Sequence, residues 1–145
     1  MIVNGLIVIF TFFFMEFVAW FAHKYVMHGF LWFLHKDHHQ VDHNKKFQKN
    51  DYFFLIFAIP SILCFVYGAE NYSYLFFIGI GIVLYGLAYF IIHEIIIHRR
   101  LPPPSKTKNK YIIAIRKAHK IHHKNRNKEH CINFGMLIVP RKYFK

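Results

Sequence analysis

Histidine is the residue with which this chain can do chemistry, because ten of its twelve histidines form a pattern that occurs twice. Each copy has a pair separated by four residues, followed by a triplet whose last two members are adjacent. The first copy comprises His23, His28, His35, His38 and His39, and the second comprises His93, His98, His119, His122 and His123. The triplet spacing i, i+3, i+4 places three imidazoles on one helix face, which is typical of metal ligands. His43 and His130 fall outside the pattern and are expected to be solvated surface residues.

The two pairs need a different explanation, because residues five apart on a straight α-helix diverge by about 140° and lie about 7.5 Å apart along its axis. Either the helix is distorted there, with Gly29 aiding the first pair, or the two histidines of a pair bind different metal ions. Two six-coordinate ions offer about twelve positions, of which ten imidazoles would fill most and leave room for oxygen or water. The pattern therefore predicts a site for two metal ions.

Other metal chemistries fit the spacing less well. His93-Glu94 to His98 is one residue longer than the His-Glu-x-x-His of zinc proteases. No acidic residue has a histidine three positions later, as carboxylate di-iron bundles require. A haem held by two histidines would not need two triplets. The two cysteines, Cys64 and Cys131, provide neither a disulfide framework nor a thiolate zinc site.

The elements that must position these histidines are predicted to be membrane-spanning helices. The chain of 145 residues is 55% hydrophobic and 18% charged, which excludes both an ordinary soluble enzyme and a disordered basic tail. Three apolar runs reach the roughly 20 residues that a helix needs to cross a bilayer: about 2–22, 52–69 and 73–92. The expected fold is an all-α integral membrane protein in which residues 1–145 form one domain. The histidine-rich segments 23–51 and 93–145 are expected to be cytoplasmic, with helical extensions and an interfacial helix.

The basic residues predict which side the histidines face. All 19 lysines and arginines lie in Lys24 to Lys49 or in Arg99 to Lys145. By the positive-inside rule both stretches face the cytoplasm, which places the amino terminus and the turn near Asn71 outside. All twelve histidines then share the cytoplasmic compartment.

Two segments after the third run are expected at the membrane surface. On a helix from Tyr111 to about Lys124, Ile112 and Ile115 share a face with the second histidine triplet. Such a helix should lie on the bilayer with its apolar face inward. The apolar run Cys131 to Val139 is too short to span and is expected to form an interfacial or re-entrant lid.

Two features within the spans also point to specific roles. Small residues recur in the third run and would permit close helix contact, although such a spacing is also common by chance; they are Gly79, Gly81, Gly86 and Ala88. Glu16 is the only charged residue inside a span and lies about 10 Å deeper than His23 on the same face. It either orients a ligand imidazole or lines the substrate path. The alternative is a protonated carboxyl satisfied by a neighbouring helix.

Taken together, these residues resemble the bacterial β-carotene hydroxylases of the fatty acid hydroxylase and sterol desaturase superfamily, over roughly Met15 to Pro140. The histidine pattern alone indicates the superfamily, whereas the stretches Tyr25 to Gly29 and Glu129 to Leu137 point to the carotenoid branch. The other matching residues are Met15-Glu16, His23-Lys24, Asn50-Asp51, Tyr85-Gly86-Leu87, Tyr89-Phe90, Ala118-His119 and Lys128.

The resemblance implies a non-haem di-iron monooxygenase that uses O2 and two electrons to hydroxylate carbon 3 of the β-carotene ring, giving β-cryptoxanthin and then zeaxanthin. It implies that the ten patterned histidines bind two iron ions, a metal that the spacing alone cannot name. Glu16 and Glu94 are the catalytic candidates beside them. Glu94 stands where this branch is expected to have Asp, and the longer carboxylate would shift the geometry around the second pair.

The charge balance and the resemblance together predict the partners. The two basic segments carry a net charge of +14, because their acidic residues are only Asp37, Asp42, Asp51, Glu94 and Glu129. This charge mainly orients the chain and should also attract anionic lipid and an acidic electron carrier such as ferredoxin. A carotenoid in the lipid bilayer is the expected substrate and a bacterial inner membrane the expected location. No nucleic acid is expected as a partner.

Two alternative functions remain open at this point. A fatty-acid or sterol hydroxylase or desaturase would use the same histidines. A metal-binding membrane protein without oxidase chemistry, such as a transporter or sensor, would need polar groups near the bilayer midplane, and only Glu16 approaches that depth.

Overall fold

A computed structural model describes residues 1–42, 47–100 and 107–145, and every regular element among these residues is a helix. Three helical stretches of this described part are long and apolar enough to cross a membrane: Ile2–Phe30, Lys49–Gly68 and Tyr74–Ile97. The predicted all-α fold with three spans is confirmed. The first and third stretches run beyond their predicted ends, and these extensions carry the first pair of histidines and His93.

The two extensions are π-helices rather than α-helices. α1 (Ile2–Phe21) continues into η1 (Ala22–Phe30), and α4 (Tyr74–Tyr89) continues into η3 (Phe90–Ile97). In this geometry a backbone N–H bonds the carbonyl five residues earlier, as the N–H of His98 does with the carbonyl of His93 at 2.9 Å. Gly29, at φ −96° and ψ −123°, interrupts helical geometry within η1. Helix distortion, the first explanation considered for the spacing of the pairs, is therefore what the structure contains.

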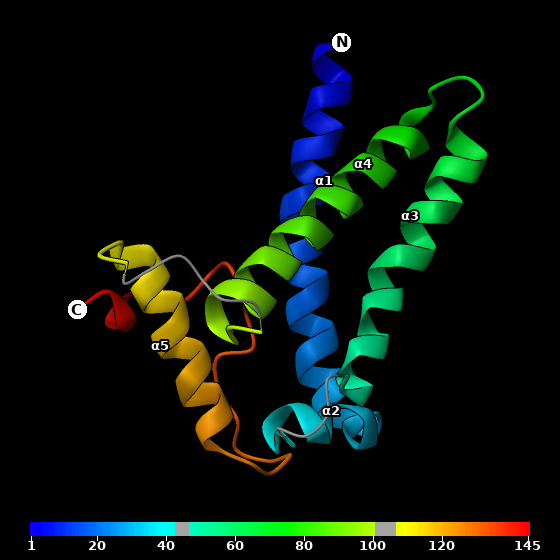
Figure 1. Ribbon diagram of the computed structural model, residues 1–145. Coiled ribbons are helices and arrows are strands. Elements are labelled where there is room, and N and C mark those ends of the chain that lie inside the picture. Colours follow the sequence, from blue (N-terminus) through cyan, green and yellow to red (C-terminus); the bar gives the residue numbers. More distant parts are fainter. Residues whose placement is uncertain (43–46, 101–106) are drawn as a thin grey trace.

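The three spans pack through α4. It crosses α1 and runs antiparallel to α3 (Leu55–Gly68), from which it diverges away from their joining turn (Figure 1). Glycines set the closest approaches: a Cβ at Gly81 would lie 2.6 Å from Thr11 Cβ, and one at Gly79 would lie 3.0 Å from the Phe65 ring. These two glycines allow close helix contact. Gly86 differs, because a Cβ there would meet no atom within 4 Å.

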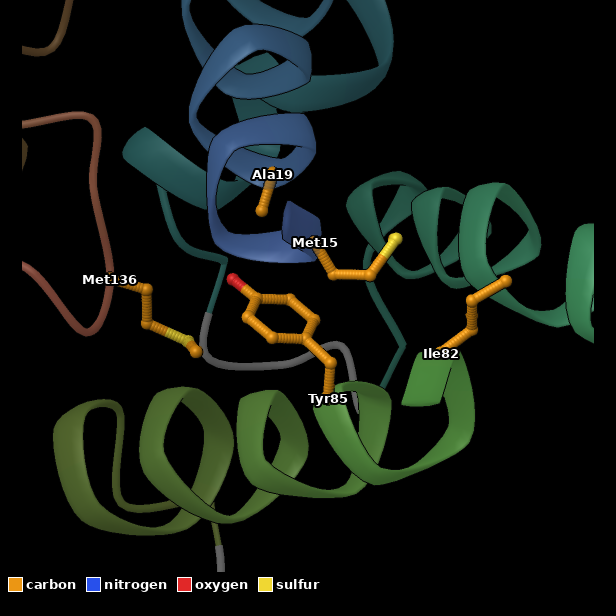
Figure 2. Packing of buried hydrophobic residues seen from close by; sticks show 5 residues of the cluster. All are labelled: Met15, Ala19, Ile82, Tyr85 and Met136. Carbon is orange, nitrogen blue, oxygen red and sulfur yellow. The ribbon is translucent and has the colours of Figure 1, made fainter. Parts of the chain in front are cut away.

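The apolar core is small and lies where α1 meets α4. Figure 2 shows its buried members, Met15, Ala19, Ile82, Tyr85 and Met136. Many other apolar side chains of the spans are exposed, among them Phe10, Ile62, Val66 and Leu87. Long helices with apolar outer faces suit a bilayer, because their exposed apolar side chains then contact lipid hydrocarbon instead of water.

The remaining helices surround the half of the bundle away from the N-terminus and the α3–α4 turn (Figure 1). They are α2 (Trp32–His39), η2 (Lys49–Phe54), α5 (Lys110–Lys124) and η4 (Arg141–Phe144). α5 is the helix expected from Tyr111 to Lys124, with Ile115 and His122 buried and Lys117 exposed. Its N-terminus is capped by Asn109, whose side chain accepts hydrogen bonds from two backbone N–H groups. That α5 rests on a bilayer surface stays a prediction.

Candidate metal centre

The ten patterned histidines come together, and nine of them form two groups. The first group is His23, His28, His35, His39 and His122, and the second is His38, His98, His119 and His123. Within each group one ring nitrogen from every member lies within 4.8 Å of those of the others. The two groups do not follow the two sequence copies, because the triplets exchange one member each. His38 of the first triplet joins the second group, and His122 of the second triplet joins the first.

His93, the tenth histidine, lies beside the second group. Its ring centroid is 4.5 Å from that of His98 and 5.0 Å from that of His38. The π-helical geometry of η3 therefore places both members of the second pair at the same group. Of the two histidines outside the pattern, His130 is exposed, as expected, and His43 lies outside the described residues.

Seven of the histidine rings are oriented by a hydrogen bond from Nδ1, the ring nitrogen on the outer side of the two groups. In each of these the Nδ1 atom lies 2.6 to 3.1 Å from an oxygen that accepts its proton, so Nδ1 carries the hydrogen and Nε2 keeps its lone pair. The acceptors are the carbonyls of Phe134, Lys128, Asn125 and Ile132 for His23, His28, His39 and His122, and the side chains of Asn50, Gln48 and Glu94 for His35, His38 and His93.

The inward nitrogens are the atoms that a metal would bind. The Nε2 atoms of His23, His35, His38, His39 and His123 are buried and have no hydrogen-bond partner in the described part of the chain. His28 Nε2 and His122 Nε2 lie 3.2 Å apart. Because both rings donate through Nδ1, two lone pairs face each other, and a cation bound there would remove the repulsion. Unpaired buried nitrogens are costly, so this arrangement fits metal ions.

The imidazoles are also in the protonation state that metal binding requires. Burial, reinforced by neighbouring imidazoles, holds the pKa of His38 and of His119 well below the ordinary value of 6.5. The same causes lower the pKa of His122 and of His98 to about 3. Burial lowers the pKa of His39 to about 4. At neutral pH these rings are uncharged and their lone pairs are available.

Glu94 belongs to a chain of charges beside His93. Its Oε1 accepts the hydrogen bond from His93 Nδ1 at 2.6 Å, and its Oε2 pairs with Arg100 Nε at 2.9 Å. Arg100 Nη1 in turn contacts Asp51 Oδ1 at 2.8 Å. Glu94 therefore touches a histidine of the centre directly. Sequence reasoning singled out Glu94 but missed Arg100, whose contact with Asp51 joins residues 49 positions apart in the chain.

Glu16 on α1 is buried, and its hydrogen bonds go to α4 and to the segment 131–139. Its Oε1 accepts the backbone N–H groups of Met136, Leu137 and Ile138 at 2.9 to 3.1 Å. Its Oε2 accepts the hydroxyl of Tyr85. Both oxygens of the Glu16 side chain are therefore used as acceptors. Among the described residues, none of these hydrogen bonds of Glu16 goes to one of the ten patterned histidines.

The segment 131–139, expected to be a lid, forms one side of the first group. It contains no helix, and the Phe134 ring packs against His23, His28 and His122 with centroids 5.1 to 5.5 Å apart. The carbonyls of Phe134 and Ile132 orient two of the same rings. Sequence reasoning missed this role, because every residue has a backbone carbonyl and the residue type does not show which carbonyl accepts a hydrogen bond.

Known proteins match the chain over most of its length. Residues 8–140 match the fatty acid hydroxylase family. A β-carotene hydroxylase of Pantoea ananas is 40% identical over 137 residues, covering 94% of this chain and 78% of that protein. Those of Paracoccus sp. (strain PC1) and Pseudescherichia vulneris are 36% and 37% identical, covering 93% and 97% of this chain and 83% and 80% of their own. No solved structure matches significantly. The chain therefore belongs to the fatty acid hydroxylase family and is related to its bacterial β-carotene hydroxylases.

Proposed function

We propose that the protein is a β-carotene 3-hydroxylase, which adds a hydroxyl group to ring carbon 3 and yields β-cryptoxanthin and then zeaxanthin. The observation that carries the proposal is the pair of histidine groups whose Nε2 atoms converge at one end of the apolar spans. Attack on an unactivated C–H bond needs a redox metal, because the side chains here cannot do it themselves. The names of the related proteins favour a carotenoid over a fatty acid or a sterol.

We assign the ten patterned histidines as ligands of two iron ions. One ion would be held by the first group, and the other by the second group together with His93. Bound iron would activate O2, which is the oxidant in the overall balance R–H + O2 + 2 electrons + 2 protons → R–OH + water. The chain itself contributes rigid ligand rings, because each outer hydrogen bond holds a tautomer and a ring orientation.

The two acidic candidates are assigned positioning roles rather than contact with the substrate. Glu94 holds His93 in place, and Glu16 holds the segment that orients His23 and His122. The four hydrogen bonds of Glu16 occupy both of its oxygens, which leaves little capacity for proton transfer.

We infer that electrons come from an acidic carrier such as ferredoxin. Exposed cations surround the loop that follows α5, at Lys124, Arg126 and Lys128. The same loop presents the carbonyls of Asn125 and Lys128 to His39 and His28. An acidic protein docked on these cations would lie close to the first group.

We infer a bacterial inner membrane as the location, with the metal centre on the cytoplasmic side. Support comes from the positions of the lysines and arginines, which all lie in Lys24 to Lys49 or in Arg99 to Lys145. These two stretches lie at the same end of the spans as the histidine groups. Residues 1–145 would form one membrane-embedded domain, because the centre takes ligands from both ends of the chain.

The test is production of the protein in a bacterium that accumulates β-carotene. Zeaxanthin should accumulate when iron is supplied. Unchanged β-carotene, despite verified insertion and iron content, would reject the proposal. A lipid profile of the same cells detects the alternative, since a fatty-acid or sterol hydroxylase would alter those lipids instead.

A further inference from the structure

α3 and α4 diverge away from their joining turn (Figure 1). Residues of both helices line a cleft of about 930 Å³. This volume lies in the range of pockets that enclose small molecules, about 300 to 1,000 Å³. One wall is η2 and α3, with Phe54 and Phe57. The other wall is α4, with Val83 and Leu87, and the start of η3, with Phe90. Most of these wall residues are exposed on the apolar part of the spans. The cleft therefore opens toward lipid.

The inner end of this α3–α4 cleft adjoins the histidine centre. Three residues at that end are hydrogen-bonded to patterned histidines: Asn50 to His35, Gln48 to His38 and Glu94 to His93. Tyr89, which also lines the cleft, stacks on the His93 ring with centroids 4.7 Å apart. A molecule that fills the cleft would thus end one side chain away from these histidine rings.

The end of the cleft away from the lipid is bridged by charges. Arg100 contacts Asp51 at the start of the second span and Glu94 at the end of the third, and all three residues line the cleft. These ion pairs join the two walls beyond the apolar part. An apolar molecule therefore enters the cleft more easily from the bilayer than from water.

We propose that the α3–α4 cleft binds the ring end and the adjoining polyene of the carotenoid substrate, which enters sideways from the bilayer. This assignment rests on the proposed function and names the substrate site that it needs. The walls favour this occupant, because their aromatic side chains offer flat apolar faces to a flat conjugated chain. The polar residues at the inner end leave no equally apolar place for the far half of so long a molecule, so one end enters and the rest stays in lipid.

Gly86 offers a way to fill the cleft without disturbing the protein. It lies in the α4 wall, and a Cβ there would meet no atom within 4 Å. A phenylalanine at this position would project into the cleft. Gly5 is the control, because it is also a glycine of a spanning helix at which a Cβ would meet no atom within 4 Å, and it does not line the cleft. Both substitutions remove a helical glycine, which if anything favours the helix.

The experiment compares the full-length protein with its Gly86→Phe, Val83→Phe and Gly5→Phe variants, each purified from cells that accumulate β-carotene. The readouts are carotenoid retained per protein after detergent washing, metal content, and zeaxanthin formed. We expect Gly86→Phe to retain at least fivefold less carotenoid and to form at least fivefold less product, at the metal content of the unaltered protein. Val83→Phe should act in the same direction, and Gly5→Phe should change neither quantity.

Each other outcome has a definite meaning. Carotenoid retention by Gly86→Phe and Val83→Phe equal to that of Gly5→Phe would overturn the cleft assignment, even if the unaltered protein makes zeaxanthin. Retention of only phospholipid by the unaltered protein would overturn it as well. If the unaltered protein retains carotenoid in a Gly86-dependent way but forms no product, the cleft assignment stands and the proposed function fails.

Discussion

Glu16 on α1 and Tyr85 on α4 are joined by a hydrogen bond of 2.7 Å in the buried contact between the two spans. The second oxygen of the same carboxylate holds three successive backbone N–H groups of residues 136–138. One side chain thus fastens two spans and the C-terminal segment together. Because that segment orients His23 and His122, the carboxylate acts on the first histidine group from a distance.

Replacing Glu16 should therefore loosen the first histidine group. Glu16→Ala leaves a buried hydroxyl and three N–H groups without an acceptor, which should lower the free energy of unfolding by about 3 kcal/mol. Tyr85→Phe removes one bond and should cost about 1.5 kcal/mol. Glu16→Gln keeps an acceptor oxygen and should cost about 1 kcal/mol. Thermal unfolding in detergent measures the order of these losses.

Metal content separates this positioning role from a general loss of stability. At a temperature where Glu16→Ala remains folded, we expect metal to be lost mainly from the first group, so that the stoichiometry falls from two ions per chain toward one. Glu70→Ala, in the exposed turn between α3 and α4, serves as the control and should bind two. Equal loss of both ions in Glu16→Ala would mean that the carboxylate has no selective link to the first group.

Single ligand substitutions should remove one metal ion each. His122→Ala removes a member of the first group, and His38→Ala removes a member of the second. Both variants should insert into membranes, bind about one ion per chain and form no zeaxanthin. His130→Ala, at an exposed position, should keep both ions and full activity. Full activity of either ligand variant would show that its histidine is not needed.

Asn50 should matter through His35 rather than through its own chemistry. Its side-chain oxygen accepts the His35 Nδ1 proton at 2.6 Å, and both side chains are buried. Asn50→Leu has a similar size and no acceptor, so metal affinity should fall about 10- to 100-fold. Asn50→Asp retains an acceptor and should bind nearly normally. Competition with a chelator measures both affinities, and equal weakening in the two variants would contradict the role.

The spans and the histidine spacing were predictable because they depend on local pattern. Long apolar runs follow from bilayer thickness. The histidine triplet of α5 lies on one helix face because its spacing matches the helical period. Two of its members, His119 and His122, are buried. The pairs left two explanations open, and only backbone hydrogen bonding of the kind seen at His98 decides between them.

The composition of each histidine group was not predictable, because it depends on how separate helices pack. The exchange of His38 and His122 between the groups follows from the placement of α2 against α5, which no repeat in the sequence specifies. The hydrogen bonds from His23 and His39 end on backbone carbonyls, which every residue has. Side-chain type therefore carries no signal for these contacts.

The Glu94 carboxylate allows a further test, because one of its oxygens accepts the hydrogen bond of His93 and the other pairs with Arg100. Glu94→Ala removes the acceptor of the His93 Nδ1 proton and should weaken metal binding about 10- to 100-fold. Glu94→Gln keeps that acceptor but loses the ion pair with Arg100, so its effect should be smaller. Arg100→Met removes only the ion pairs, which are partly exposed, and should cost less than about 1 kcal/mol. Arg99→Met is the matched control for loss of a neighbouring exposed charge. Chelator competition on all four variants ranks them, and an Arg100→Met protein that loses metal as readily as Glu94→Ala would show that the ion pairs, rather than the hydrogen bond to His93, hold the ring in place.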